Sequence, residues 1–305
     1  MPRRRYLQTA LPSDDGRAHH TEQVETDQDD PISYLDVLDR VHTRLQPRVY
    51  LEIGIRHGDA AAFALPGTRV IGVDPAPSLR RPLPKGIEIE RRTSDDFFDS
   101  GRAAELLDEQ KIDFAFIDGM HLFEFALRDL LNVEQFAAPG SLVMLHDCLP
   151  LSADAASREF KEGGWTGDVW KVLLYLRDHR PDLDICVFDA APTGLAVVQG
   201  LNPSRPLLDI SVDIDRYIDL DFSAYTDDLF PTLEVVRGDL PAMESRLSTA
   251  PWQDLPDVAK LTKARDRRRA RRQASLRRLR RSLKGKLRRT RVGTFLARSR
   301  RRLRR

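Results

Sequence analysis

Short apolar runs alternate with longer amphipathic stretches through the first two thirds of the chain. The runs are rich in Val, Ile and Leu and have the length of strands, so each predicts a buried β-strand. The last two runs lie three residues apart around Ala-Pro-Thr, a spacing that predicts an antiparallel hairpin. The predicted strands span residues 49–55, 69–75, 87–92, 112–119, 141–147, 184–190 and 194–199.

The amphipathic stretches between these runs predict helices. In residues 31–47, Leu35, Leu38, Val41 and Leu45 recur at helical spacing, and Pro47 ends the pattern. Further helices are predicted at residues 58–64, 100–110, 123–136 and 167–179. Because apolar strands alternate with helices, we expect an α/β fold whose mostly parallel sheet is covered by helices on both faces.

Composition divides the chain into four parts. Residues 1–30 are polar with little to bury, which predicts disorder. Residues 31–200 hold the predicted α/β domain. Residues 201–262 are acidic and rich in proline, which predicts an irregular extension with short helices and makes it a candidate lid. Residues 263–305 form a basic C-terminal arm.

The net charge of +2 hides a strong asymmetry along the chain. Residues 263–305 contain 22 Lys and Arg and one acidic residue, out of 49 basic and 47 acidic residues in all. The arm therefore carries a charge of +21 and the remainder a charge of −19. The two parts need separate explanations.

The arm also has an apolar face. Leu276, Leu279, Leu283 and Leu287 recur at steps of three and four residues, which would place them on one side of a helix surrounded by arginine. Such a segment could bind an anionic membrane surface, nucleic-acid phosphates or the acidic part of the chain itself. The leucines slightly favour the membrane, because phosphate binding does not require them.

Cysteine content and hydropathy bear on location. Cys148 and Cys186 are the two cysteines, too few and too far apart for a disulfide scaffold or a zinc motif. No apolar run approaches the length of a membrane span, and the N-terminus lacks the apolar region of a signal peptide. We therefore expect a cytoplasmic protein, which the arm could hold at the inner face of the membrane.

The first two strands end in residues that suit a ligand site. The first leads into Glu52-x-Gly54-x-x-x-Gly58, a glycine turn that allows the backbone to approach a ligand closely. The second ends at Asp74, whose carboxylate could accept hydrogen bonds from two vicinal ribose hydroxyls. The turn lacks the dinucleotide fingerprint and the Lys-Ser/Thr of a P-loop.

Together these residues resemble the first motif and the following acid of class I S-adenosylmethionine (SAM)-dependent methyltransferases. The resemblance implies a Rossmann-like sheet of seven strands that ends in an antiparallel hairpin. It also implies that Glu52, Gly54 and Gly58 line the methionine end of SAM and that Asp74 holds the ribose. Ser94 and Asp95, after the third strand, would lie near the adenine.

The next two strand ends narrow the resemblance. Residues 117–121 read Ile-Asp-Gly-Met-His, and His146 and Asp147 end the fifth strand. These motifs are similar to a branch of methyltransferases that act on oxygen atoms of small molecules and sugars. The resemblance covers roughly residues 32–200 and places Asp118 beside the cofactor as well as the acceptor.

Two kinds of chemistry fit these side chains. Asp118, His146 and Asp147 could bind Mg²⁺ or another divalent ion, although imidazole suits Mg²⁺ less well than oxygen does. Related metal-dependent enzymes have an acid or amide where His146 stands. Alternatively, His121 or His146 could act as a general base on a hydroxyl, with Asp147 or Asp118 orienting the ring.

The favoured function is therefore SAM-dependent methyl transfer to a hydroxyl of a small-molecule or glycan acceptor. One alternative is a nucleic-acid methyltransferase that uses the basic arm, but the chain lacks the Asn/Asp-Pro-Pro-Tyr/Phe stretch of many such enzymes. A second alternative is a SAM-binding module without turnover that the arm tethers to an anionic surface.

Overall fold

The computed structural model describes residues 32–80, 83, 86–162, 164–211, 213–225, 228–236 and 240–246. All of them belong to one compact unit that begins at Pro31. The predictions for residues 1–30 and for the basic arm at residues 263–305 fall outside this described part. Within it, no helix combines the length and apolar character that crossing a membrane requires.

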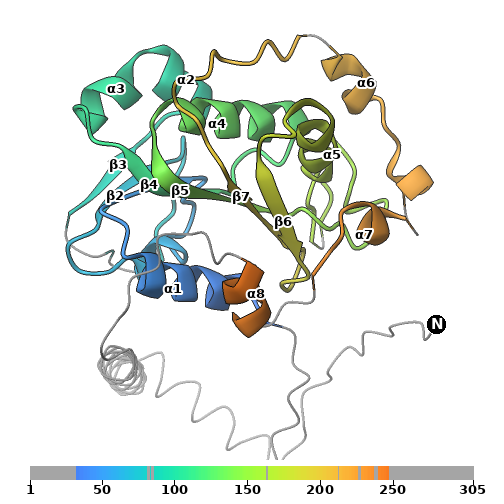
Figure 1. The fold of residues 1–305 in the computed structure, drawn as a ribbon, viewed down its shortest axis with the longest axis horizontal. Helices are drawn as coiled ribbons and strands as arrows, with labels where there is room; N and C mark the ends of the chain where they lie inside the picture. The colour runs from blue at the N-terminus through green and yellow to red at the C-terminus, as the bar shows by residue number, and fades with distance from the viewer. Residues whose placement is uncertain are drawn as a thin grey trace, which may run out of the picture. The chain divides into compact units, whose positions relative to one another are not determined.

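Seven strands form one sheet at the centre of the fold (Figure 1). Their order is β3-β2-β1-β4-β5-β7-β6, and β7 runs antiparallel to both of its neighbours while the other pairs are parallel. The strands are β1 (Val49–Ile53), β2 (Arg69–Val73), β3 (Ile87–Glu90), β4 (Ile112–Ile117), β5 (Ala137–His146), β6 (Asp184–Phe188) and β7 (Leu195–Gln199). This topology confirms the predicted Rossmann-like sheet and its terminal antiparallel hairpin.

The register of the parallel strands sets the position of everything that follows them. Ile53 of β1 pairs with Val73 of β2 on one side and with Ile117 of β4 on the other. Ile117 in turn pairs with Leu145 of β5. The carboxyl ends of these four strands are therefore level. From β1 the chain builds the sheet outward to β2 and β3 on one side, and then to β4 and β5 on the other. Open α/β sheets bind ligands in the crevice at such a reversal of strand order.

Helices cover both faces of the sheet, as the alternating pattern predicts. Helix α1 (Tyr34–Leu45) packs on one face, and Ser33 and Asp36 begin it with reciprocal capping hydrogen bonds. Helices α4 (Phe123–Gln135) and α5 (Trp170–His179) pack on the opposite face (Figure 1).

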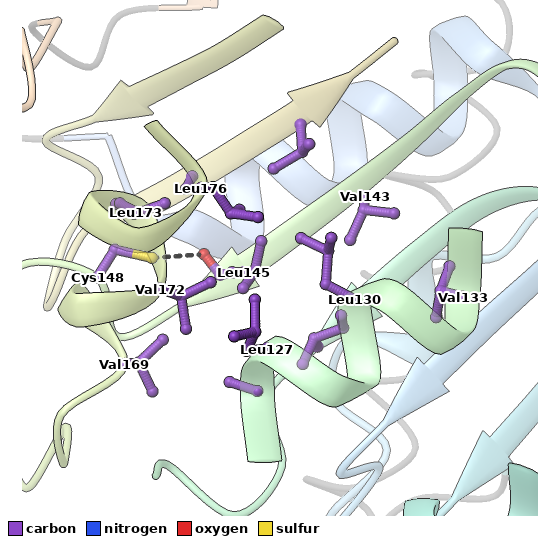
Figure 2. Close-up of a cluster of buried hydrophobic side chains, with 14 of the residues drawn as sticks. Leu127, Leu130, Val133, Val143, Leu145, Cys148, Val169, Val172, Leu173 and Leu176 are labelled. Atoms are coloured by element: carbon purple, nitrogen blue, oxygen red, sulfur yellow. Dashed lines mark hydrogen bonds between the residues drawn. The ribbon is translucent and has the colours of Figure 1, made fainter. Parts of the chain in front are cut away.

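The core between β5, α4 and α5 consists of interdigitated aliphatic side chains (Figure 2). Leu130 of α4, Leu145 of β5 and Leu176 of α5 are fully buried there. The Cys148 thiol donates a hydrogen bond to the Leu145 carbonyl at 3.3 Å. Burying one such leucine contributes about 1.5–3 kcal/mol. The carboxyl end of β5 therefore stands on a tightly packed base.

Three predicted elements differ from the structure. The helix predicted at 100–110 is the shorter α3 (Arg102–Leu107), and an additional short helix, α2 (Ser94–Asp99), precedes it, with Gly101 in the left-handed region between them. The helix predicted at 58–64 shrinks to one 3₁₀ turn, η1 (Ala61–Phe63). The strand predicted from residue 141 begins at Ala137. Its Pro139-Gly140 pair lies in an irregularity of the ladder with β4, where proline is tolerated.

The extension after residue 200 contains short helices, as predicted, and packs on the domain. It comprises α6 (Ile214–Ile218), η2 (Phe222–Tyr225), α7 (Leu229–Thr232) and α8 (Leu240–Arg246). The Tyr217 hydroxyl donates to Asp178 of α5 at 2.6 Å. Val236 forms a parallel bridge with Phe188, which covers part of the outer edge of β6. Its role as a lid stays a prediction.

A buried ion pair joins α4, α5 and the beginning of the extension. The Arg180 guanidinium donates to both carboxylate oxygens of Glu134 at 2.8 Å, and the two side chains are 0% and 2% exposed. Glu134 also accepts the backbone N–H of Asn202, and Asp182 shares the guanidinium. Such a pair becomes costly when one partner is removed, because the other charge stays buried.

We expect Glu134→Ala to lower the free energy of unfolding by about 3 kcal/mol, because the Arg180 charge would stay buried without its main partner. The loss should not be larger, because Asp182 would still contact Arg180. The matched control is Glu105→Ala, which removes an ion-paired carboxylate that is 72% exposed and should change the free energy by less than about 0.5 kcal/mol. Urea unfolding followed by circular dichroism measures both. Equal losses in the two variants would contradict the importance of the buried pair.

Candidate functional site

The level strand ends bring four chemically active side chains together. Asp118 follows β4, His121 lies three residues later, and His146 and Asp147 stand at the end of β5. The sequence predicted that these residues converge, and the structure brings them into direct contact. All four were predicted as catalytic or metal-binding residues.

Asp118 is at the centre of this cluster. Its Oδ1 lies 3.1 Å from Nε2 of His121 and 3.3 Å from Nδ1 of His146. Burial alone would raise the pKa of the Asp118 carboxyl. The two neighbouring imidazoles outweigh that effect and hold the pKa well below its usual range. Asp118 is therefore ionised at neutral pH.

Asp147 completes a ring of alternating carboxylates and imidazoles. Its Oδ2 lies 3.1 Å from Nδ1 of His121, and its Oδ1 lies 3.4 Å from Nδ1 of His146. The Thr193 hydroxyl, from the loop before β7, donates to Oδ1 as well. Each carboxylate of the cluster thus contacts both imidazoles, which fixes the orientation of all four side chains.

The backbone around His121 is held by the segment just before α5. His121 has φ of +59°, in the left-handed region, so its side chain turns back toward β4. Its carbonyl accepts the backbone N–H of Asp168, and a Cβ on Gly167 would stand 1.7 Å from that carbonyl oxygen. The Asp168 carboxylate in turn accepts the backbone N–H of Phe123. The segment before α5 therefore clamps the turn that carries His121.

His146 is buried deeper than His121. Burial opposes its protonation, but the Asp118 and Asp147 carboxylates override this effect and raise the pKa of His146 to about 10. Its ring lies against Tyr34 of α1, with centroids 4.0 Å apart. Its Nε2 is buried and has no hydrogen-bond partner in the described part of the chain.

Glu52 lies in β1 on the face that α1 covers. The Tyr50 hydroxyl donates to Glu52 at 2.8 Å. Burial raises the pKa of Glu52 to about 8, and Asp118, Asp59 and Asp74 add to the shift by repulsion. Three further carboxylates thus stand close enough to Glu52 to disfavour its charged form.

The glycine turn and Asp74 are shaped first by the protein itself. A Cβ on Gly54 would stand 2.0 Å from the Asp118 carbonyl oxygen, so the end of β4 requires glycine there. A Cβ on Gly58 would stand 2.6 Å from the end of the Leu83 side chain, which could move aside more easily than backbone. Asp74 accepts the backbone N–H groups of Arg56 and Ala76, which ties the loops after β1 and β2 together. The predicted contacts of these residues with SAM stay predictions.

Ser94 and Asp95, predicted near the adenine, lie in the first turn of α2. Asp95 makes a two-armed ion pair with Arg128 of α4, at 3.0 and 2.8 Å. The Ser94 side chain hydrogen-bonds the buried Asp129 carboxyl, whose pKa burial raises to about 7. Both residues therefore have structural partners, and their contact with adenine stays a prediction.

The grouping of possible metal ligands differs from the one the sequence indicated. Among the described residues, ligand atoms of Asp118, His121 and Asp147 lie within 4.8 Å of one another. The metal prediction named His146 where the geometry brings in His121. The left-handed backbone at His121 and Asp147 accounts for the difference, because it turns these two side chains toward each other. Two carboxylates and an imidazole suit Mn²⁺, Fe²⁺ or Zn²⁺ better than Mg²⁺.

Three neighbours of the cluster were not predicted as site residues. Tyr34 comes from α1. Burial raises the pKa of its hydroxyl to about 12, and the carboxylates around it add to the shift. Thr193 comes from the final hairpin. Trp165, which the pattern left as core or cleft wall, stacks on His121 with centroids 5.3 Å apart. Nothing in the sequence near Tyr34 or Thr193 marks them, because their contacts arise from tertiary packing.

Known proteins place this site in context. Residues 51–148 match the model of a family described as a methyltransferase domain. No curated protein matches the chain. Among solved structures, the O-methyltransferase from Bacillus cereus in complex with SAH is 14% identical, with 54% of this chain and 80% of that chain covered and a TM-score of 0.40. The O-methyltransferase TomG from Streptomyces achromogenes, in complex with SAM, is 16% identical, with 55% and 79% covered and a TM-score of 0.43.

The family match extends from β1 to the residue after Asp147. It thus includes the glycine turn, Asp74 and the whole carboxylate–imidazole cluster. Residues 51–148 are thus similar to a methyltransferase domain, as the motifs predicted, and the order of the strands confirms the Rossmann-like fold.

Proposed function

We propose that this protein transfers the methyl group of SAM to a hydroxyl oxygen of a small-molecule or glycan acceptor. One observation carries the proposal. The segment that matches a methyltransferase domain is also the segment whose level strand ends assemble Glu52, Asp74 and the Asp118–His121–His146–Asp147 cluster. The remaining support comes from the charge of that edge.

The charge around Glu52 supports a cationic cofactor. Burial raises the pKa of Glu52, and three nearby carboxylates, those of Asp118, Asp59 and Asp74, raise it further. SAM carries a positive sulfonium and a positive ammonium, so its binding would relieve this repulsion. We assign the methionine end to Glu52 and the two glycines of the turn, and the ribose to Asp74.

We assign the adenine to the neighbourhood of Ser94 and Asp95. Asp118 stands between the two sides of the site, because its backbone adjoins Gly54 and its carboxylate faces the two histidines. The reacting methyl group would therefore lie near Asp118.

The cluster itself would align the acceptor and manage its proton. His121 and Asp118 are 20% and 24% exposed, so an acceptor hydroxyl can reach them from solvent. His146 is 8% exposed and sits behind them, where its positive charge offsets part of the charge of the two carboxylates. Methyl transfer requires the hydroxyl proton to leave as the oxygen meets the methyl group, so the chain mainly provides alignment and deprotonation.

We further propose that Asp118, His121 and Asp147 hold a divalent cation. The donor set and its close spacing fit a first-row transition metal. Such an ion would lower the pKa of a coordinated hydroxyl. His121 would have to be neutral to bind it, and the two carboxylates would have to turn from the imidazoles toward the ion.

We place the protein in the cytoplasm, with the basic arm bound to an anionic partner. The two buried cysteines are free thiols, which suits a reducing compartment. A charge of +21 attracts counter-charge, and the leucine stripe slightly favours an anionic membrane surface over nucleic acid.

The cofactor assignment predicts that the protein binds S-adenosylhomocysteine in isothermal titration. Gly54→Ala should weaken this binding about 100-fold, because the new methyl group would displace the turn from the Asp118 carbonyl by about 1 Å. Gly67→Ala is the control, since Gly67 also has positive φ but its Cβ would meet nothing within 4 Å. A folded wild-type protein that does not bind millimolar ligand contradicts the proposed function.

The metal assignment predicts Mn²⁺ binding to the full chain, measured by titration calorimetry without acceptor. Asp118→Asn should weaken it by about tenfold or more, because one anionic ligand is lost. Asp96→Asn, which removes an exposed carboxylate of α2, should leave it unchanged. Equal affinity in wild type and Asp118→Asn would rule out this ion site and leave His121 as the candidate base.

The arm assignment predicts that the full chain sediments with vesicles containing phosphatidylglycerol. Removal of residues 263–305 should abolish this, while S-adenosylhomocysteine binding stays unchanged. Retention on RNA with a steep salt dependence, and none on vesicles, would favour nucleic acid instead.

A further inference from the structure

Tyr34, the first residue of α1, is fixed over the ends of two central strands. Its ring lies against the ring of His146 at the end of β5, with centroids 4.0 Å apart, and stacks on Phe116 of β4 at 6.2 Å. Its backbone N–H donates to the Ala191 carbonyl at 3.0 Å, and Ser33 caps the helix at this point. The fold therefore sets the position of the Tyr34 ring, so little conformational entropy is lost when a ligand meets it.

The register of the sheet shows which side chains lie beside this ring. Glu52 of β1 pairs with Phe116 of β4, and Phe116 belongs to the core beneath α1. Side chains of a strand return to the same face at every second residue, so Asp118 follows Phe116 on the α1 face. There its Oδ1 lies 3.3 Å from Nδ1 of His146. Tyr34 thus lies over a row of polar side chains that runs from the cofactor side of the site to the end of β5.

The Tyr34 hydroxyl lies among carboxylates from both sides of the site. Asp118 and Asp147 belong to the cluster, and Asp59 and Glu52 lie on the side assigned to the cofactor. No hydrogen bond of this hydroxyl to another residue is found in the described part of the chain. A hydroxyl donates one proton and accepts with two lone pairs. When the proton points to a carboxylate, the lone pairs stay available to a ligand.

The methyl group of SAM is a ligand group that suits these lone pairs. The positive sulfonium draws electron density from the methyl C–H bonds, which makes them weak donors to oxygen. The proposed function places this methyl group near Asp118, between the carboxylates that surround the Tyr34 hydroxyl. Burial and these carboxylates keep the hydroxyl protonated, and a protonated phenol is too weak a nucleophile to take the methyl group itself.

We propose that Tyr34 is a catalytic residue whose hydroxyl oxygen contacts the methyl group of SAM and aligns it with the acceptor oxygen. This inference rests on the proposed methyl transfer, and it assigns a role to a residue outside the segment that matches a methyltransferase domain. The contact leaves the bonds of the reaction unchanged. The acceptor oxygen bonds to the methyl carbon, the sulfonium–methyl bond breaks and leaves its electron pair on sulfur, and the acceptor proton passes to solvent.

The test compares three ligands of the full chain by titration calorimetry, without acceptor. SAM has the methyl group, S-adenosylhomocysteine lacks it, and sinefungin has an ammonium group at the same place. Tyr34→Phe removes the hydroxyl and keeps the ring on His146. It should weaken SAM binding about threefold, as expected for one C–H···O contact. Sinefungin binding should weaken about tenfold or more, because a hydrogen bond to a charged group is lost, and S-adenosylhomocysteine binding should stay unchanged.

Tyr225→Phe is the matched control, since it removes the hydroxyl of a tyrosine that packs on Trp170 in the extension. It should change none of the three affinities. If Tyr34→Phe binds SAM and sinefungin as tightly as wild type does, the contact is overturned and the methyltransferase remains. An equal loss for all three ligands also overturns the contact, because the hydroxyl then acts on a part that they share. A folded wild-type protein that does not bind S-adenosylhomocysteine overturns the proposed function and this inference with it.

Discussion

The common level at which β1, β2, β4 and β5 end is the constraint on which the site depends. Ile53 of β1 pairs with a residue of β2 on one side and with Ile117 of β4 on the other, and Ile117 also pairs with Leu145 of β5. Residues that are distant in the sequence therefore emerge at one edge of the sheet. A shift of one residue in any of these pairings would move a side chain to the opposite face. The buried aliphatic core beneath β5 makes such a shift costly.

Charge is balanced differently on the two sides of Asp118. Toward the acceptor, two carboxylates meet two imidazoles, and each group finds partners within the cluster. Toward β1, Glu52 is buried near other carboxylates, and the Tyr50 hydroxyl is its neutral partner. A cation is therefore more favourable on the second side. The same strand ends thus provide a balanced polar cluster and an unbalanced acidic one.

The order of the strands and the residues at their ends could be predicted, because both follow from apolar runs and the motifs after them. The cluster of Asp118, His121, His146 and Asp147 was recognisable for this reason. The choice between His121 and His146 in the triad was not, because it depends on left-handed backbone at two positions that carry no glycine. Helix α2 was missed because its six residues, half of them aspartate, are too few to show a period. Tyr34 and Thr193 reach the site only through tertiary contacts.

The contact between Gly54 and the Asp118 carbonyl links the two loops mechanically. No space for even a methyl group remains between them, and interiors packed to this density transmit displacement instead of absorbing it. The turn after β1 and the turn after β4 therefore move as one body. Whatever orders the first also sets the carboxylate and the imidazole that follow the second. Because the glycine leaves no gap at this contact, a ligand that binds beside the turn after β1 also affects the position of the residues that follow β4.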